Sequence, residues 1–339
     1  MTAGVRIRLL SMNRICLLIA TMLIVVTSCL ASEKPRPSTQ HATVVYEAIV
    51  YLAADSSSGR VATVTPGHEV ALLEHNGPWV RAFANIDGQE VASDEPEFGM
   101  AENVTPVSGW MLDKGVVSSQ TPNGDVILFG AAADAETDAT SPHPGKRSAN
   151  DARLLYRRVP QYFPQSPLAA EAAWRSADIR WQMEKVDAMS RPSAHEREAY
   201  LREQLNEDEM KKIIRHYPNS KWADYAAYAM LDNKVCGDWQ GLEKCPEKES
   251  SLYEKFAEQH PGGPRTAQAL YEAAYRQAVL VDMYTADDEK NKAAGAQSKA
   301  IALAQKISST FPGSDYAPRA AALVYKLQQH VAVYGADHD

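Results

Sequence analysis

Residues 213–226 read Ile-Ile-Arg-His-Tyr-Pro-Asn-Ser-Lys-Trp-Ala-Asp-Tyr-Ala, and this stretch decides the fold of the second half of the chain. An apolar helical face runs into an aromatic residue and a proline, a serine follows, and an alanine-rich amphipathic segment begins. Proline cannot continue a helix, and serine is a preferred N-cap of a new one. The stretch therefore predicts two helices joined by a short turn.

The same unit occurs four times between residues 151 and 339. Its prolines are Pro164, Pro218, Pro261 and Pro312. The residue five positions before each proline is apolar, at Val159, Ile213, Phe256 and Ile307, and the residue eight positions after it is alanine, at Ala172, Ala226, Ala269 and Ala320. N-cap candidates stand two positions after it, at Ser166, Ser220, Gly263 and Ser314. Because alanine lets helices approach closely, we expect an all-α helical solenoid over residues 151–339.

This unit resembles the tetratricopeptide repeat, and especially the repeats of the outer-membrane assembly lipoprotein BamD and related periplasmic proteins. One departure is the spacing, because successive prolines are 54, 43 and 51 residues apart, against about 34 in that repeat. The extra residues, such as 189–206 and 286–296, are expected to lengthen helices or add loops. The resemblance implies a groove that binds a partner, although aromatic residues at helical spacing more often fill a core. Candidate groove residues on the second helices are Trp174, Trp222, Tyr225, Tyr271 and Tyr275.

Residues 42–118 have a different pattern, in which short β-branched runs alternate with turn residues. This pattern predicts a compact all-β domain. Pro66-Gly67, Gly77-Pro78-Trp79-Val80 and Gly109-Trp110-Met111 resemble the corresponding parts of the bacterial SH3-like (SH3b) domain. The expected fold is therefore a small SH3-like barrel, with an acidic insertion over residues 94–97 as a departure.

Bacterial SH3-like domains often bind peptides or cell-wall material, so the resemblance makes exposed aromatic residues candidate ligand contacts. These candidates are Tyr46, Tyr51 and Trp110. We expect Trp79 to fill the barrel core, because a small barrel needs large side chains to close. Trp110 could occupy the core or the surface.

Residues 119–150 connect the two regions. They begin with a turn at Thr121-Pro122-Asn123-Gly124, and the apolar run over 126–129 could pack against a neighbouring domain. From residue 134 onward the segment has few large apolar side chains. Such a composition buries too little surface to order itself, so we expect a flexible linker.

The amino terminus has the features of an export signal. Three arginines precede an apolar run of twelve residues, from Ile15 to Val26, which is shorter than the roughly twenty residues of a spanning helix. Val26-Thr27-Ser28-Cys29 resembles a lipoprotein lipobox, which implies a signal peptide over 1–28 and lipidation of Cys29. A signal cleaved after Ala31 and an uncleaved anchor are the alternatives. Leu30 in place of Asp favours the outer membrane, with residues 29–41 as a tether.

The charge and the cysteines limit the remaining possibilities. Loss of residues 1–28 would remove three arginines and no acid, changing the formal net charge from −8 to about −11. A chain this acidic is a poor nucleic-acid binder. Cys236 and Cys245 lie nine positions apart in an interhelical loop, which in an exported chain favours a disulfide. A metal site would need further ligands nearby, and two free thiols are the other alternative.

Sequence motifs of catalysis are missing. There is no Gly-x-Ser-x-Gly, Walker loop or Cys-x-x-Cys, and His195-Glu196 lacks the second histidine of a zinc helix because position 199 is alanine. We therefore expect no enzyme, no metal and no cofactor. The first hypothesis is a periplasm-facing outer-membrane lipoprotein that acts as a scaffold for envelope proteins, with the barrel-assembly machinery as the implied partner. The second is a tether or sensor that binds peptidoglycan peptides. An accessory to an envelope enzyme, or a hydrolase, is a third class.

Overall fold

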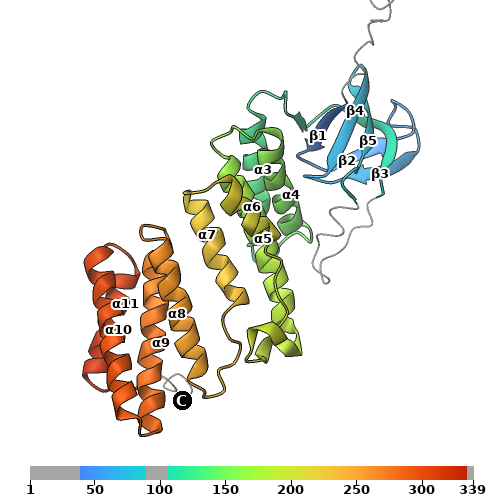
Figure 1. Ribbon diagram of the computed structural model, residues 1–339. Helices are drawn as coiled ribbons and strands as arrows, with labels where there is room; N and C mark the ends of the chain where they lie inside the picture. The colour runs from blue at the N-terminus through green and yellow to red at the C-terminus, as the bar shows by residue number, and fades with distance from the viewer. Residues whose placement is uncertain (1–38, 89–104, 334–339) are drawn as a thin grey trace, which may run out of the picture. The chain divides into compact units, whose positions relative to one another are not determined.

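The computed structural model describes residues 39–88 and 105–333. In these residues seven strands form one antiparallel sheet, and nine α-helices follow it (Figure 1). The predicted order of a β region and then an α region is confirmed. The signal peptide over 1–28, Cys29, most of the tether over 29–41 and the acidic insertion over 94–97 lie outside the described residues.

The sheet is built from short strands with small inward side chains. The strands are β1 (Gln40–Val44), β2 (Ala48–Tyr51), β3 (Arg60–Val64), β4 (Glu69–Asn76), β5 (Trp79–Ala84), β6 (Val107–Leu112) and β7 (Val116–Ser118). Their order is β3-β2-β6-β5-β4-β1-β7, and every pair with a defined register is antiparallel. Valine and alanine fill the core, and Met111 is the largest side chain in it.

Trp79 does not lie in this core, so that expectation is wrong. Along β5 the residues Val80, Ala82 and Ala84 are fully buried, whereas Trp79 is half-buried and lies on the other face of the strand. Side chains alternate between the faces of a strand, so a shift of one residue along β5 is the difference between the core face and the outer face. The inward positions carry valine, alanine and one methionine, and this small core is complete without a tryptophan.

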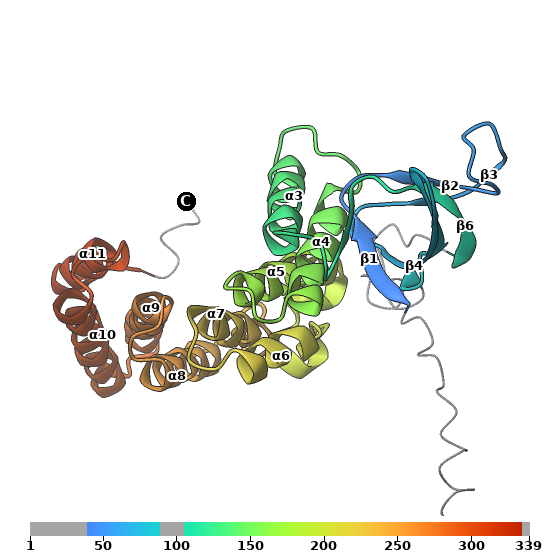
Figure 2. The ribbon, with the colours of Figure 1, turned by 90° about the horizontal axis from the view of Figure 1, so that it is seen from above.

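After α3, the helices form four successive pairs. The helices are α3 (Gly124–Ala139), α4 (Ser148–Tyr162), α5 (Ala169–Ser190), α6 (Asp208–His216), α7 (Lys221–Ala229), α8 (Lys244–Gln259), α9 (Thr266–Ala286), α10 (Lys290–Thr310) and α11 (Tyr316–Gln328). The four sequence units correspond to α4–α5, α6–α7, α8–α9 and α10–α11. Figure 2 shows α7 and α9 on one side of the array and α6 and α8 on the other.

The predicted turns are confirmed in all four units. The residue after each first helix has nearly the same backbone, with φ between −125° and −130° and ψ between 51° and 61°. Its N–H donates to the carbonyl of the apolar residue four positions earlier. These apolar residues and the matched alanines are at most 4% exposed. The apolar residue five positions before each proline therefore fills the core, and its carbonyl also accepts the last hydrogen bond of the helix.

The predicted N-caps are only partly correct. Ser220 caps α7, and its Oγ accepts from the N–H of Ala223 at 3.2 Å. In the other three units the helix begins two or three residues later, because an intervening turn forms first. The extra residues after α5 form two short 3-10 helices, Pro192–His195 and Ala199–Leu201.

The expectation of a flexible linker over residues 119–150 is also wrong. Half of this segment is helix α3, and α4 begins at Ser148. Leu128 and Ala132 of α3 are fully buried in a cluster with Leu155 and Val159 of α4. The segment is poor in large apolar residues, but α4 supplies the surface that its few apolar residues need in order to be buried.

A buried polar network joins the sheet to α4. The Nη2 of Arg158 binds the carboxylate of Asp87, and its Nε donates to the carbonyl of Gly67 at 2.8 Å. Asp87 Oδ1 also lies 3.2 Å from His68 Nδ1 and accepts from the N–H of Glu69 at 3.0 Å. Arg158, Asp87 and His68 are at most 3% exposed. A charge this deeply buried is tolerated only when it is paired and hydrogen-bonded.

The ionisation of Asp87 follows from this network. Burial alone would raise the pKa of the carboxyl, but the hydrogen bond with His68 and the charge of Arg158 outweigh burial and hold the pKa below its ordinary value. A carboxyl with a lowered pKa in the folded state stabilises the fold at neutral pH. That stabilisation is lost as the pH falls through the folded-state pKa.

The turn at Pro66-Gly67 lies directly against α4. Gly67 has φ of +83°, and a Cβ at this position would lie 2.7 Å from the backbone nitrogen of Leu155 and 2.8 Å from the carbonyl carbon of Leu154. Only glycine satisfies both the left-handed backbone and the close approach. This glycine allows the turn to present its carbonyl to Arg158.

We predict that Gly67→Ala destabilises the protein by about 2–5 kcal/mol, from left-handed strain together with overpacking against α4. Chemical unfolding followed by circular dichroism measures the change. Gly77→Ala is the matched control, because Gly77 also has positive φ but has open space where a Cβ would stand. We expect it to cost only about 1 kcal/mol. Equal losses in the two variants would contradict the close packing at Gly67.

We predict that Asp87→Asn lowers the free energy of unfolding by about 3–5 kcal/mol at pH 7, because it removes the closest and most buried carboxylate partner of Arg158 and leaves only Glu69, at 3.8 Å. Unfolding curves recorded between pH 7 and pH 2 should show the wild-type advantage constant above about pH 4. Below that pH the advantage should shrink as Asp87 takes up a proton. A difference that persists unchanged at pH 2 would show that the carboxylate charge is not what stabilises the junction.

Candidate functional site

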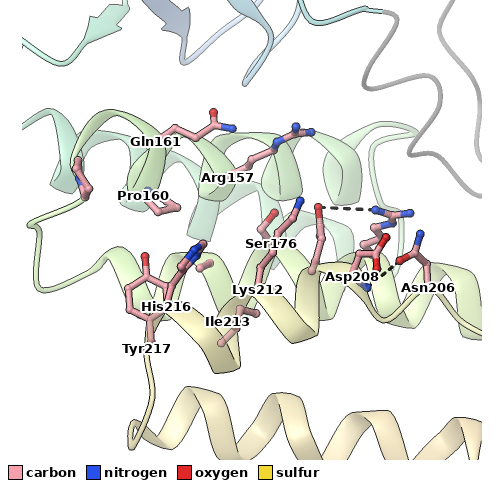
Figure 3. A pocket seen from close by; sticks show the side chains of 14 residues that line it. Arg157, Pro160, Gln161, Ser176, Asn206, Asp208, Lys212, Ile213, His216 and Tyr217 are labelled. Atoms are coloured by element: carbon pink, nitrogen blue, oxygen red, sulfur yellow. Dashed lines mark hydrogen bonds and ion pairs between the residues drawn. The ribbon is translucent and has the colours of Figure 1, made fainter.

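A groove with a volume of about 620 Å³ opens between α4 and α6, with α5 beneath it (Figure 3). α4 and α6 are the first helices of two successive units, so the groove lies between repeats. Its volume is in the range of pockets that bind ligands or short segments of a partner. The groove is therefore the first candidate for a binding site.

Both walls follow from helical periodicity. α4 contributes positions 157, 160 and 161, and α6 contributes positions 209, 212, 213 and 216. Residues three and four apart lie on one face of a helix, so each set forms a single stripe. The floor comes from Ala173, Ser176 and Arg180 of α5. Figure 3 shows Lys212 extending from α6 toward α4 beside Ser176.

Apolar and charged groups are mixed in the groove. Pro160, Ile213 and Tyr217 supply apolar surface, and Arg157 and His216 supply polar edges. This combination can bind a segment through contact area and direction.

The charges are unevenly distributed along the groove. Arg180 is neutralised, because its guanidinium lies 2.8 Å from Glu184 and 3.7 Å from Glu209. Asp208 and Glu209 place acid at the amino-terminal end of α6. Lys212 is exposed, and no acid of the described residues pairs with it. The middle of the groove therefore carries a cation that forms no ion pair with the described residues.

The five predicted groove aromatics lie elsewhere. Trp174 of α5 stacks on Tyr225 of α7 with ring centroids 5.4 Å apart, and Trp222 lies 5.8 Å from the same tyrosine. All three are half-buried, and Trp174 and Trp222 pack against the cluster that contains Trp181. They hold α5 and α7 together, and they do not line the α4–α6 groove.

The other two predicted residues are on α9. Tyr271 lies 5.6 Å from Tyr316 of α11, and Tyr275 packs against a second cluster in the last repeats. Both are half-buried. The structure thus divides the five aromatics between two inter-helix contacts, the packing role that is usual for aromatic residues at helical spacing.

The sequence pattern did not identify three groove residues, Arg157, Lys212 and His216, as members of a site. Charged stripes on a helix are usually solvated surface, so their pattern alone did not mark a site. A signal was available in the repeat register, because Lys212 stands six residues before Pro218 and Arg158 stands six residues before Pro164. Only the structure shows that Arg157, the residue next to Arg158 in the first unit, lines a groove opposite Lys212.

The sheet has an aromatic outer face. Trp110 is paired with Tyr51 across β2 and β6, and the Tyr51 ring meets Trp79 edge to face at 5.6 Å. Phe83 and Leu112 are exposed on the same side of β5 and β6. The structure thus brings together two of the three predicted ligand contacts, Tyr51 and Trp110. The expectation that Tyr51 is exposed is wrong, because its side chain is only 8% exposed beneath the edge-to-face contact with Trp79. Tyr46 lies apart, against the turn at Gly115.

Cys236 and Cys245 are joined by a disulfide, with Cα atoms 5.9 Å apart. The loop they close is tied to Glu249, a carboxylate that is 1% exposed. Glu249 accepts from the N–H of Cys236 at 2.9 Å, from Trp239 Nε1 at 3.1 Å and from Arg276 Nε at 2.8 Å. The loop is therefore fixed to α8 and α9 at several points.

No group of three or more His, Cys, Asp or Glu side chains in the described residues could hold a metal ion. None of the described helices is both long and apolar enough to cross a membrane.

Comparison with known proteins identifies no family. No protein-family model matches the chain, and no curated protein matches it in sequence.

We predict that replacing Cys236 and Cys245 by alanine lowers the free energy of unfolding by about 2–3 kcal/mol, the chain-entropy value for a loop of this length. Urea unfolding measures the loss. Wild-type protein in excess reductant is the control, and it should unfold at the midpoint of the double variant. An unchanged midpoint in both would show that Glu249 alone holds the loop.

Proposed function

We propose that this protein is a non-catalytic envelope lipoprotein, lipidated at Cys29 and held at the outer membrane facing the periplasm. In this proposal its helix pairs are tetratricopeptide-like repeats that bind a segment of a partner protein. The observation that carries the proposal is the groove between α4 and α6, which combines apolar walls with Lys212, a cation that forms no ion pair with the described residues. By the resemblance in sequence, the partners are envelope proteins such as components of the barrel-assembly machinery.

The repeated backbone geometry supports this reading of the helices. Four helix pairs end their first helix in the same conformation, which is how a repeat array offers similar surfaces in succession. Grooves between successive first helices accept helices or extended segments of other proteins. The α4–α6 groove is such a site in size and position.

The junction with the sheet supports a fixed platform beside the groove. Arg158 binds Asp87 of the sheet and also donates through Nη1 to Gln161 Oε1 at 2.7 Å. Gln161 lines the groove. One arginine therefore connects the sheet, which we propose to be an SH3-like barrel, to the wall of the groove.

A second candidate function rests on the aromatic face of the sheet. Tyr51, Trp79 and Trp110 form one patch with exposed Phe83 and Leu112 beside them. Aromatic surfaces of this kind suit peptidoglycan peptides, which would make the protein a cell-wall tether or sensor. The two functions use different surfaces, so one experiment can separate them.

The experiment is site-specific photocrosslinking in living cells, with a photoreactive amino acid at His216 in the groove, at Phe83 on the sheet and at Lys255 as control. All three positions are exposed, and Lys255 lies outside the groove. We expect a defined protein adduct at His216 and none at Lys255, identified by mass spectrometry.

Muropeptide adducts at Phe83, together with no adduct at His216, would contradict the scaffold function and support the cell-wall tether. Equal adducts at His216 and Lys255 would show that the groove has no preference and would contradict the proposal.

A further inference from the structure

We propose that the segment held in the α4–α6 groove is acidic and that a side-chain carboxylate of the partner binds at Lys212. This inference rests on the proposed function and specifies the chemistry of the partner. It is carried by the repeat register, by the charge left over in the groove and by the composition of its walls.

The register supplies the first argument. Arg158 and Lys212 occupy the same position of their units, six residues before the proline. In the first unit this position already binds a carboxylate, that of Asp87 from the neighbouring sheet. In the second unit the equivalent cation lies in the groove that faces the first unit, and no acid of the described residues fills the corresponding place. A partner carboxylate would complete at Lys212 the pairing that Asp87 completes at Arg158.

The surrounding charges supply the second argument. Arg157 lines the groove from α4, on the opposite wall from Lys212. Arg180 is already paired with Glu184 and Glu209, so it adds little positive potential. Lys212 is therefore a groove cation whose charge is offset by no ion pair among the described residues, although the chain as a whole has a formal charge of −8. This contrast favours an anionic segment.

The two ends of the groove carry different groups, which would fix the direction of a bound segment. Asp208 and Glu209 stand at one end, where they would repel a further acid of the partner. Pro160, Ile213 and Tyr217 offer apolar contact toward the other end (Figure 3). Repulsion at one end and attraction at the centre together set the register of a bound segment. We infer a short acidic run that is flanked by apolar residues.

The test is a titration of the full chain, isotope-labelled at isoleucine methyl groups, with acetyl-tetraglutamate amide as the probe. The methyl resonance of Ile213 reports directly on the groove. We expect a saturable shift with the tetraglutamate and none with acetyl-tetraglutamine amide, which has the same size without charge.

Two exposed lysines provide matched variants. Lys212→Glu should weaken binding about tenfold or more, because it places an acid opposite the bound carboxylate. Lys255→Glu makes the same substitution at the same repeat position of the next unit, outside the groove, and should change affinity by less than about twofold. Thermal unfolding of both variants should match the wild type.

The outcomes separate this inference from the proposed function. Absence of a saturable Ile213 shift, an equal shift with tetraglutamine, or unchanged affinity in Lys212→Glu would overturn the acidic segment. If the His216 crosslink forms nevertheless, the scaffold function stands with a partner of different chemistry. Binding in the titration without any crosslink in cells would leave the acidic site intact and remove the proposed scaffold role.

Discussion

Arg158 and Asp87 form an ion pair that is almost completely excluded from water, and the arrangement of the first helices depends on it. The Arg158 guanidinium also contacts the turn at Gly67 and the groove residue Gln161. It therefore connects Asp87, the turn and the groove wall on α4. Burying two charges is costly, so the pair is maintained only while the remaining hydrogen bonds are made. The sheet is therefore positioned specifically against α4, with no flexible segment between the two.

Helix α4 shows how one short sequence serves three neighbours. Leu155 and Val159 pack against α3, Arg158 reaches the sheet, and Arg157 lines the groove. These residues are adjacent in the chain but point to different sides of the helix, since successive residues are rotated by about 100°. A change in the register of α4 would disturb the core, the junction and the groove together.

The helix pairs were predictable because proline and alanine act locally. Pro218 disfavours continuation of the helix before it, and Ala226 allows a close contact on the buried face of the helix after it. Helix α3 was not predictable by the same reasoning, because Leu128 and Ala132 are buried by residues from α4. The predicted core position of Trp79 was wrong for a related reason. Its large side chain suggested the core, but the strand places it on the outer face. The aromatic candidates Trp174, Trp222 and Tyr225 were predicted to line a groove, but they meet in the contact between α5 and α7, outside the α4–α6 groove.

The sequence by itself determined the order of a β region and an α region, the four helical turns and the buried positions on either side of each proline. These depend on periodicity and on residues whose backbone preferences hold in any context. Only the tertiary structure decided that Asp87 meets Arg158 across 71 positions of sequence and that Lys212 faces Arg157 across a groove. Electrostatic pairing depends on distance in space, and that distance is set only when separate elements have packed.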